Sequence, residues 1–232
     1  MRIALIGHGK MGRAVEQVAT TRGHAIAAIV GKEQSASLTR DSLGGADVAV
    51  EFSVPEAAVP NALACVRSGV PVVVGTTGWT SQLATLEREV QRANGALLWA
   101  PNFSIGVQLL AQLVEKLASL TPEARGFALQ MIETHHAAKK DAPSGTAAML
   151  AKLYTAAAAT DIPITSVRIG HVPGRHEIIA DGQYEQLRLV HEARDRRVFA
   201  DGAVTAAEWL AQSGRRGVFT LRDVLSSDGG GR

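Results

Sequence analysis

A glycine-rich turn near the start of the chain constrains the fold more than any other feature. Ile3–Ile6 is a short apolar run typical of a buried strand, and a second such run, Ala25–Val30, follows a helix-compatible stretch. The turn itself, which directly follows the first run, is Gly7-His8-Gly9-Lys10-Met11-Gly12. Glycines in this setting permit a tight turn and let backbone N–H groups approach a phosphate at the helix N-terminus. The turn therefore predicts a dinucleotide site, with a tight turn that binds nothing as the plainer alternative.

Strands and helices continue to alternate up to residue 100. Strand candidates occur at Asp47–Phe52, Val70–Val74 and Ala96–Ala100, with helical stretches at Glu56–Arg67 and Thr80–Arg92 between them. Connections of this length favour parallel pairing of the strands. We therefore expect a doubly wound parallel sheet.

Two further segments follow predicted strands at the sheet edge where open α/β folds bind ligands. Gly75-Thr76-Thr77-Gly78 offers small residues and hydroxyl groups, although a flexible turn explains it equally simply. Ala100-Pro101-Asn102-Phe103 ends the next strand, and its proline marks the stop. Both segments are candidates to extend the dinucleotide cleft.

The end of the second strand bears on the choice between the two dinucleotides. The acidic residue that would bind the ribose hydroxyls of NAD is missing from Ile29-Val30-Gly31-Lys32. A lysine there favours the additional phosphate of NADP, although Lys32 is also compatible with an exposed loop position. NADPH, NADH or both are expected as cofactors.

The pattern changes after Asn102. The expected elements there are helices at Ile105–Leu120, Ser144–Ala159 and Val204–Gln212 and strands at Phe127–Glu133, Ser166–His171, His176–Ala180, Gln186–His191 and Gly217–Thr220. The middle strands have no helices between them, and Asp181-Gly182 is a turn signal. They predict an antiparallel or mixed sheet.

Composition excludes several classes of function. The chain has 24 Lys and Arg against 22 Asp and Glu, too balanced for a dedicated nucleic-acid binder. Its apolar runs are far shorter than the roughly 20 residues that span a bilayer, and we expect a cytoplasmic protein with no membrane segment. Cys65 is the only cysteine and is interpreted as a buried small hydrophobic residue.

The densest group of chemically useful residues lies in one loop, Glu133–Ala147. It contains His135, His136, Lys139 and Lys140, followed by a helix start at Ser144. Histidine titrates near neutral pH and lysine supplies positive charge, while hydroxyls and free N–H groups at a helix start bind carboxylates. The loop predicts proton transfer beside an anionic substrate.

Two other interpretations compete with proton transfer for this loop, a metal site and a surface loop without function. Adjacent histidines on an extended strand point to opposite faces, no third ligand is obvious nearby, and the lysines repel cations, so no metal site is expected. A surface polar loop without function is the plainer alternative.

Across essentially the whole chain, the sequence resembles the dihydrodipicolinate reductase family. Glu133–Ala147 is similar to that family's E-x-H-H-x-x-K-x-D-A-P-S-G-T-A signature, and Gly75–Gly78 and Asn102–Ser104 occur where its cofactor contacts lie. The resemblance implies that His135 donates or accepts the catalytic proton and that Lys139 is a second donor. It implies substrate carboxylate binding by His136, Ser144, Gly145 and Thr146, and cofactor contacts by Gly7–Gly12, Gly75–Thr77 and Ala100–Phe103.

The resemblance also implies the overall organisation. We expect an N-terminal Rossmann dinucleotide-binding domain, residues 1–103 completed by 213–232, and an α+β substrate and oligomerisation domain with a mixed sheet, residues 104–212. The family implies a homotetramer that joins through these sheets and reduces a small cyclic dicarboxylate on the diaminopimelate route to lysine. The chain departs from the family in a glycine turn one residue shorter and in the missing acid after the second strand.

Two alternatives remain at this point. Another two-domain Rossmann dehydrogenase, acting on an amino acid or semialdehyde, would share the first strand–helix–strand unit but would not need the loop of His135 and Lys139. A non-catalytic nucleotide sensor would keep Gly7–Gly12 and lack proton donors.

Overall fold

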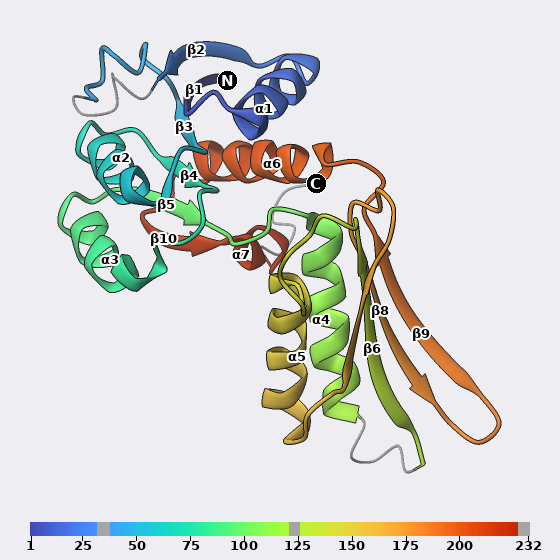
Figure 1. Cartoon of the computed structure of the whole chain (residues 1–232). Coiled ribbons are helices and arrows are strands. Elements are labelled where there is room, and N and C mark those ends of the chain that lie inside the picture. Colours follow the sequence, from blue (N-terminus) through green and yellow to red (C-terminus); the bar gives the residue numbers. More distant parts are fainter. Residues whose placement is uncertain (32–37, 121–125, 227–232) are drawn as a thin grey trace. The chain divides into compact units, whose positions relative to one another are not determined.

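The computed structural model describes residues 1–31, 38–120 and 126–226 (Figure 1). Their contacts divide the chain into two units, Met1–Phe103 with Phe199–Arg232, and Ser104–Val198. The chain thus returns to the first unit at Phe199, earlier than the expected residue 213. Within the described residues, no helix is both long and apolar enough to cross a membrane.

The first unit is built on one parallel sheet. Its strands are β1 (Arg2–Ile6), β2 (Ala25–Val30), β3 (Val48–Glu51), β4 (Val72–Val74), β5 (Ala96–Trp99) and β10 (Gly217–Thr220), in the order β10-β5-β4-β3-β1-β2. All neighbouring strands pair in parallel. The expected doubly wound parallel sheet is confirmed, and it includes a strand from the C-terminal segment.

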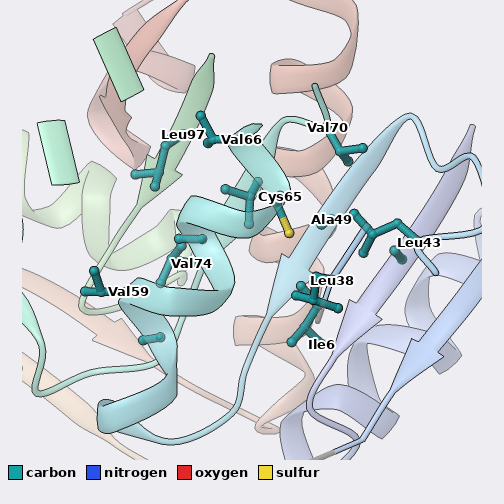
Figure 2. Close-up of a cluster of buried hydrophobic side chains, with 14 of the residues drawn as sticks. Ile6, Leu38, Leu43, Ala49, Val59, Cys65, Val66, Val70, Val74 and Leu97 are labelled. Carbon is teal, nitrogen blue, oxygen red and sulfur yellow. The ribbon is translucent and has the colours of Figure 1, made fainter. Parts of the chain in front are cut away.

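Helices connect these strands. They are α1 (Lys10–Thr21), α2 (Pro55–Arg67), α3 (Leu83–Arg92) after a 3-10 turn at Thr80–Gln82, α6 (Arg197–Ser213) and α7 (Leu221–Ser226). The α1 helix buries one stripe, Gly12, Val15 and Ala19, at the spacing expected of an amphipathic helix. The core between α2 and the sheet is a cluster of aliphatic side chains, shown in Figure 2. Cys65 is fully buried in it, as expected, and burial raises the pKa of its thiol to about 12.

The α6 helix begins at Arg197, well before the expected start near Val204. A carboxylate oxygen of Asp195 accepts a hydrogen bond from the backbone N–H of Arg197, which stabilises this earlier start. Farther along, Glu208 on α6 accepts from both Arg22 and His24, which lie beside α1 and β2. Arg22 also donates to Asp201 at 2.6 Å, in the part of α6 that precedes the expected start. This contact comes from far along the chain, so local pattern alone did not indicate it.

The second unit is a mixed sheet covered on one face by two helices. Its elements are α4 (Ile105–Leu120), β6 (Ala128–His135), α5 (Gly145–Ala158), β7 (Ile164–Arg168), β8 (Arg175–Asp181) and β9 (Gln186–Glu192). The strand order is β7-β6-β8-β9, with β6 and β7 parallel and the other pairs antiparallel. Met131 and Ile178 on the sheet pack with Leu110, Val114 and Leu150 of the helices. The expected mixed sheet is confirmed.

Candidate active site and cofactor cleft

The glycine turn in the first unit is too tightly packed for side chains. A Cβ on Gly7, whose φ is +86°, would lie 2.2 Å from the backbone oxygen of Phe52. A Cβ on Gly12 would lie 2.1 Å from the backbone oxygen of Gly7. Gly9 precedes the first residue of α1, so Lys10, Met11 and Gly12 form the first helical turn. The backbone N–H groups of a first turn have no acceptor within the helix and can bind a ligand at its N-terminus. This is the geometry that accommodates a pyrophosphate.

Two cavities open at the carboxyl edge of the parallel sheet beside this turn. One, of about 290 Å³, is lined by residues that include Gly7, His8, Gly9, Gly31 and Ser53. The other, of about 450 Å³, is lined by Gly9, Lys10, Met11, Phe52, Ser53, Pro55, Gly75, Thr76 and Thr77. The structure therefore brings the glycine turn and the Gly75–Thr77 segment to one cleft. Their small residues and free helix N-terminus suit a dinucleotide.

Phe52 joins three loops at this edge, a role that the sequence did not indicate. Its ring leaves no room for a side chain at Gly75, where a Cβ would lie 2.1 Å from ring carbons. It also meets the buried ring of Phe103 edge to face, with centroids 6.0 Å apart. The Ala100–Phe103 segment comes directly after β5, and the contact between Phe103 and Phe52 holds it at the same edge of the sheet. Ala100, Pro101 and Asn102 do not line either of the two cavities.

Lys32 and its neighbours up to residue 37 lie outside the described residues. The structure therefore bears on the dinucleotide choice only up to Gly31, which lines the smaller cavity just after the end of β2. The preference implied by Lys32 stays a prediction.

In the second unit, His135 is the last residue of β6, two positions beyond the expected strand end at Glu133. Alternation along the strand places both side chains on one face. Glu133 is fully buried, and its Oε2 is hydrogen-bonded to Nδ1 of His135. Burial opposes the ionisation of Glu133, but hydrogen bonds from Arg168, Ser166 and His135 lower its pKa to about 2. Burial, partly offset by Glu133, lowers the pKa of His135 below its usual value.

Two more histidines extend this group, His176 on β8, which pairs with β6, and His191 on β9, which pairs with β8. The ring centroids of His135 and His176 are 5.2 Å apart, and those of His176 and His191 are 6.4 Å apart. The hydroxyl of Ser144 is 3.2 Å from Nε2 of His176, and that of Ser104 is 3.2 Å from Nε2 of His191. Burial lowers the pKa of His176 to about 4, so this ring is neutral at pH 7.

The predicted carboxylate-binding residues gather at the start of α5. The Ser144 hydroxyl accepts from the Ala147 N–H at 3.2 Å and so caps the helix, while Gly145 is exposed and Thr146 half-buried. A carboxylate already lies here. Asp141 accepts from Nζ of Lys139 at 2.8 Å and from the backbone N–H of Gly145.

His136 follows the strand and is half-buried, with Nε2 at 3.5 Å from the guanidinium of Arg196. The backbone oxygen of His136 accepts from the N–H of Lys139, so a turn carries the chain from one residue to the other. The structure thus places His135, His136, Lys139 and Ser144 in one unit, close to the end of one sheet and the start of α5.

The structure corrects one argument about metals. Ligand atoms of Glu133, His135 and His176 lie within 4.8 Å of one another, so a third potential ligand does stand near the histidine loop. It comes from β8, which local sequence could not reveal. Both oxygens of Glu133 are, however, engaged by Arg168 and His135. The expectation that no metal binds stays a prediction.

Sequence reasoning assigned no role to Glu133, Arg168 or His176. The spacing of Glu133 and His135 could have revealed the first, because residues two apart on a strand share a face. Arg168 and His176 reach the cluster only through the pairing of β6 with β7 and β8, where His135 lies opposite Arg168 and Glu133 opposite His176.

A Rossmann-type cleft in one unit and a cluster of histidines, lysine and a capped helix start in the other are typical of a nicotinamide-dependent oxidoreductase. Comparison with known proteins specifies the family. Residues 1–103 match the model of the dihydrodipicolinate reductase N-terminus, and residues 106–225 match that of its C-terminus. The chain belongs to this family, and it is an NAD(P)H-dependent oxidoreductase.

Individual relatives agree with this assignment. The chain is 35% identical to 4-hydroxy-tetrahydrodipicolinate reductase of Christiangramia forsetii, over 97% of this chain and 98% of the relative. It is 37% identical to the enzyme of that name from Xanthomonas campestris pv. campestris, over 94% of each. Among solved structures, dipicolinate-bound dihydrodipicolinate reductase from Paenisporosarcina sp. TG-14 has a similar fold, with a TM-score of 0.81, 23% identity and coverage of 95% of this chain and 97% of that one. The predicted resemblance is confirmed, and it favours the reductase over the alternative dehydrogenase and the nucleotide sensor.

Proposed function

We propose that His135 is the catalytic proton donor or acceptor, with Lys139 as a second proton donor, in the reaction of this enzyme, which reduces 4-hydroxy-tetrahydrodipicolinate to tetrahydrodipicolinate on the diaminopimelate route to lysine. Replacing a hydroxyl group by hydrogen consumes one hydride and one proton and releases water. The bound reduced nicotinamide supplies the hydride. The proton must come from the protein or from water.

The pairing of His135 with a buried carboxylate, directly before the lysine loop, is the observation that carries this proposal. An ionised Glu133 favours a proton on His135, whereas burial of the ring favours its release. A histidine under these opposing influences can give and regain a proton near neutral pH. Lys139, next along the loop, adds positive charge where the substrate becomes more negative.

The start of α5 is the proposed carboxylate site, formed by His136, Ser144, Gly145 and Thr146. Asp141 supports this assignment, because its carboxylate accepts hydrogen bonds from Lys139 and Gly145 there. A substrate carboxylate has the same charge and the same two oxygens. It can therefore use the same donors in place of Asp141.

For the cofactor, we propose that Gly7–Gly12 and Gly75–Thr77 hold the dinucleotide and that Ala100–Phe103 completes the cleft. His8, Gly9 and Gly31 line the smaller cavity, into which an adenosine group would fit. We further propose that Lys32 favours NADPH, with NADH as a second hydride donor. Comparison of kcat/KM for both cofactors in the native protein and in Lys32→Ala tests this: only the NADPH value should fall.

We also propose a homotetramer formed through the sheet of the second unit. Within this unit α4 and α5 cover the face that carries Met131 and Ile178. The opposite face carries Val190, which is 48% exposed, together with the half-buried Ile132 and Ile179 on the neighbouring strands. A group of apolar side chains on one exposed sheet face is typical of an interface. Light scattering should show a smaller assembly for Val190→Glu and an unchanged one for Tyr184→Glu, in the loop after β8.

We propose a cytoplasmic location, which cell fractionation would test.

Alanine variants test the catalytic roles. His135→Ala and Lys139→Ala should each lower kcat about 100-fold or more, the usual scale for a lost acid or base, with cofactor affinity unchanged. His171→Ala and Lys140→Ala are the controls, since both side chains are exposed, and both should retain native turnover. Near-native kcat in His135→Ala would remove this histidine from the mechanism.

A further inference from the structure

Glu133 is the centre of the hydrogen-bond network in the second unit. Its Oε2 contacts Nδ1 of His135, and its Oε1 accepts from the guanidinium of Arg168 at 2.7 Å. The same Oε1 accepts from the backbone N–H of Ser144 at 3.3 Å, just before α5. One fully buried carboxylate thus contacts the proposed proton donor and the proposed carboxylate site.

Arg168 makes this carboxylate a stable anion. Its Nη2 lies 2.7 Å from Glu133 and also donates to the backbone oxygen of Asp141 at 2.6 Å. The guanidinium acts together with hydrogen bonds from Ser166 and His135, which also favour the ionised carboxylate and lower the pKa of Glu133 to about 2. Arg168 also ties the loop that carries Lys139 to β7.

The contact determines which nitrogen of His135 transfers the proton. An ionised carboxylate can only accept hydrogen bonds, so Nδ1 must carry a hydrogen. Nε2 has no hydrogen-bond partner among the described residues, and it faces Gly174, where a Cβ would lie 3.0 Å away. A side chain at position 174 would crowd Nε2, so a glycine there leaves this nitrogen unobstructed by a side chain.

We propose that Glu133, held by Arg168, is a positioning residue that keeps the hydrogen of neutral His135 on Nδ1 and so makes Nε2 the atom that exchanges protons with the substrate. This inference rests on the proposed role of His135. It extends that role to two residues that do not themselves need to touch the substrate.

The charges around His135 set the expected direction of the effect. Glu133 raises the pKa of His135, whereas Lys139 and Arg168 lower it. His176 adds no charge at neutral pH, because its pKa is about 4. Removing the charge of Glu133 should therefore lower the pKa of His135 further. Removing that of Arg168 should raise it.

The principal experiment is the pH profile of kcat/KM for Glu133→Gln and Arg168→Gln. If protonated His135 is the donor, the alkaline limb should move to lower pH by about one unit or more in Glu133→Gln, a loss of about 10-fold above the native limb. It should move to higher pH in Arg168→Gln. A purely structural role would lower activity in both variants without opposite shifts.

Glu208→Gln is the matched control. Glu208 also accepts from a histidine and an arginine, His24 at 2.7 Å and Arg22 at 2.9 Å, but in the first unit. Its pH profile should superimpose on the native one. A Glu133→Gln profile that also superimposes on the native one would overturn either the positioning role of Glu133 or the proposed function of His135, and the tautomer of His135 distinguishes the two.

Nitrogen NMR of His135 in the ligand-free native and Glu133→Gln proteins provides a readout independent of turnover. The native ring should be protonated on Nδ1 when neutral, whereas the glutamine amide can donate to Nδ1 and should shift the hydrogen towards Nε2. An unchanged tautomer would overturn the positioning role, whatever the kinetics. A changed tautomer with an unchanged pH profile would instead overturn the proposed function of His135 as proton donor.

Discussion

Gly12→Ala is the sharpest test of the cofactor cleft, because it adds one methyl group where the backbone leaves no space. The new Cβ would lie 2.1 Å from the backbone oxygen of Gly7, whereas ordinary contact begins at 3.4 Å. The turn must therefore move by roughly 1 Å or more, since neither the helix nor the backbone oxygen is compressible.

The expected magnitude follows from two opposing effects. Strain from overpacking costs about 1–3 kcal/mol, while alanine in a helix gains up to about 1 kcal/mol over glycine. The fold should therefore lose roughly 0–2 kcal/mol of stability. Displacing backbone N–H groups from the phosphate costs binding directly, and about 1.4 kcal/mol corresponds to tenfold in affinity. We expect NADPH and NADH to bind about 10 to 100 times more weakly.

Cofactor dissociation constants from fluorescence titration and unfolding in urea measure the two effects. Gly145→Ala is the control for folding and for cofactor affinity, because it also lies in the first turn of a helix but has no atom within 4 Å of the added carbon. It should bind cofactor normally and be no less stable than the native protein. Native affinity for both cofactors in Gly12→Ala would refute the assignment of this turn to the pyrophosphate.

Three further predictions concern the second unit. Burial lowers the pKa of His176 to about 4 from a usual 6.5, so between these pH values the unfolded state binds more protons than the folded state. The free energy of unfolding should therefore decrease by up to about 3 kcal/mol as the pH falls through this window. Urea midpoints should show a smaller decrease in His176→Gln. Leu150→Ala, at a fully buried site, should cost about 2–5 kcal/mol in the same assay, against little for the half-exposed Leu109→Ala. Thr146→Val should raise the KM for substrate more than that for cofactor, and the reverse would assign this helix start to the wrong ligand.

Most elements could be predicted from local pattern. The bounds of α4 were expected as observed, because a long apolar stretch begins after a proline and a capping serine and has helical spacing throughout. The parallel sheet followed from alternating apolar runs and helices. The early start of α6 could not be predicted, because Arg194–Arg197 has the composition of a polar turn and because Arg22, far along the chain, contacts Asp201 in the added part of the helix.

The candidate site also contains residues that the sequence indicated and residues that only the structure revealed. His135, Lys139 and Ser144 lie within one short segment, so their residue types and spacing alone indicated acid–base chemistry beside a carboxylate site. The spacing of Glu133 and His135 was equally visible, but its meaning depended on the strand reaching residue 135. Phe52 had no signal at all, since only the sheet brings the loops after β3, β4 and β5 together around its ring.

The sequence by itself determined the strand and helix types, the glycine turn and the family, because these depend on residues close together in the chain. Tertiary structure alone decided that Arg168 and His176 meet Glu133 and His135, since these contacts depend on strand register across β6, β7 and β8. It also decided the charge states of the cluster. A pKa depends on burial and on neighbours in space, and neither is encoded by spacing along the chain.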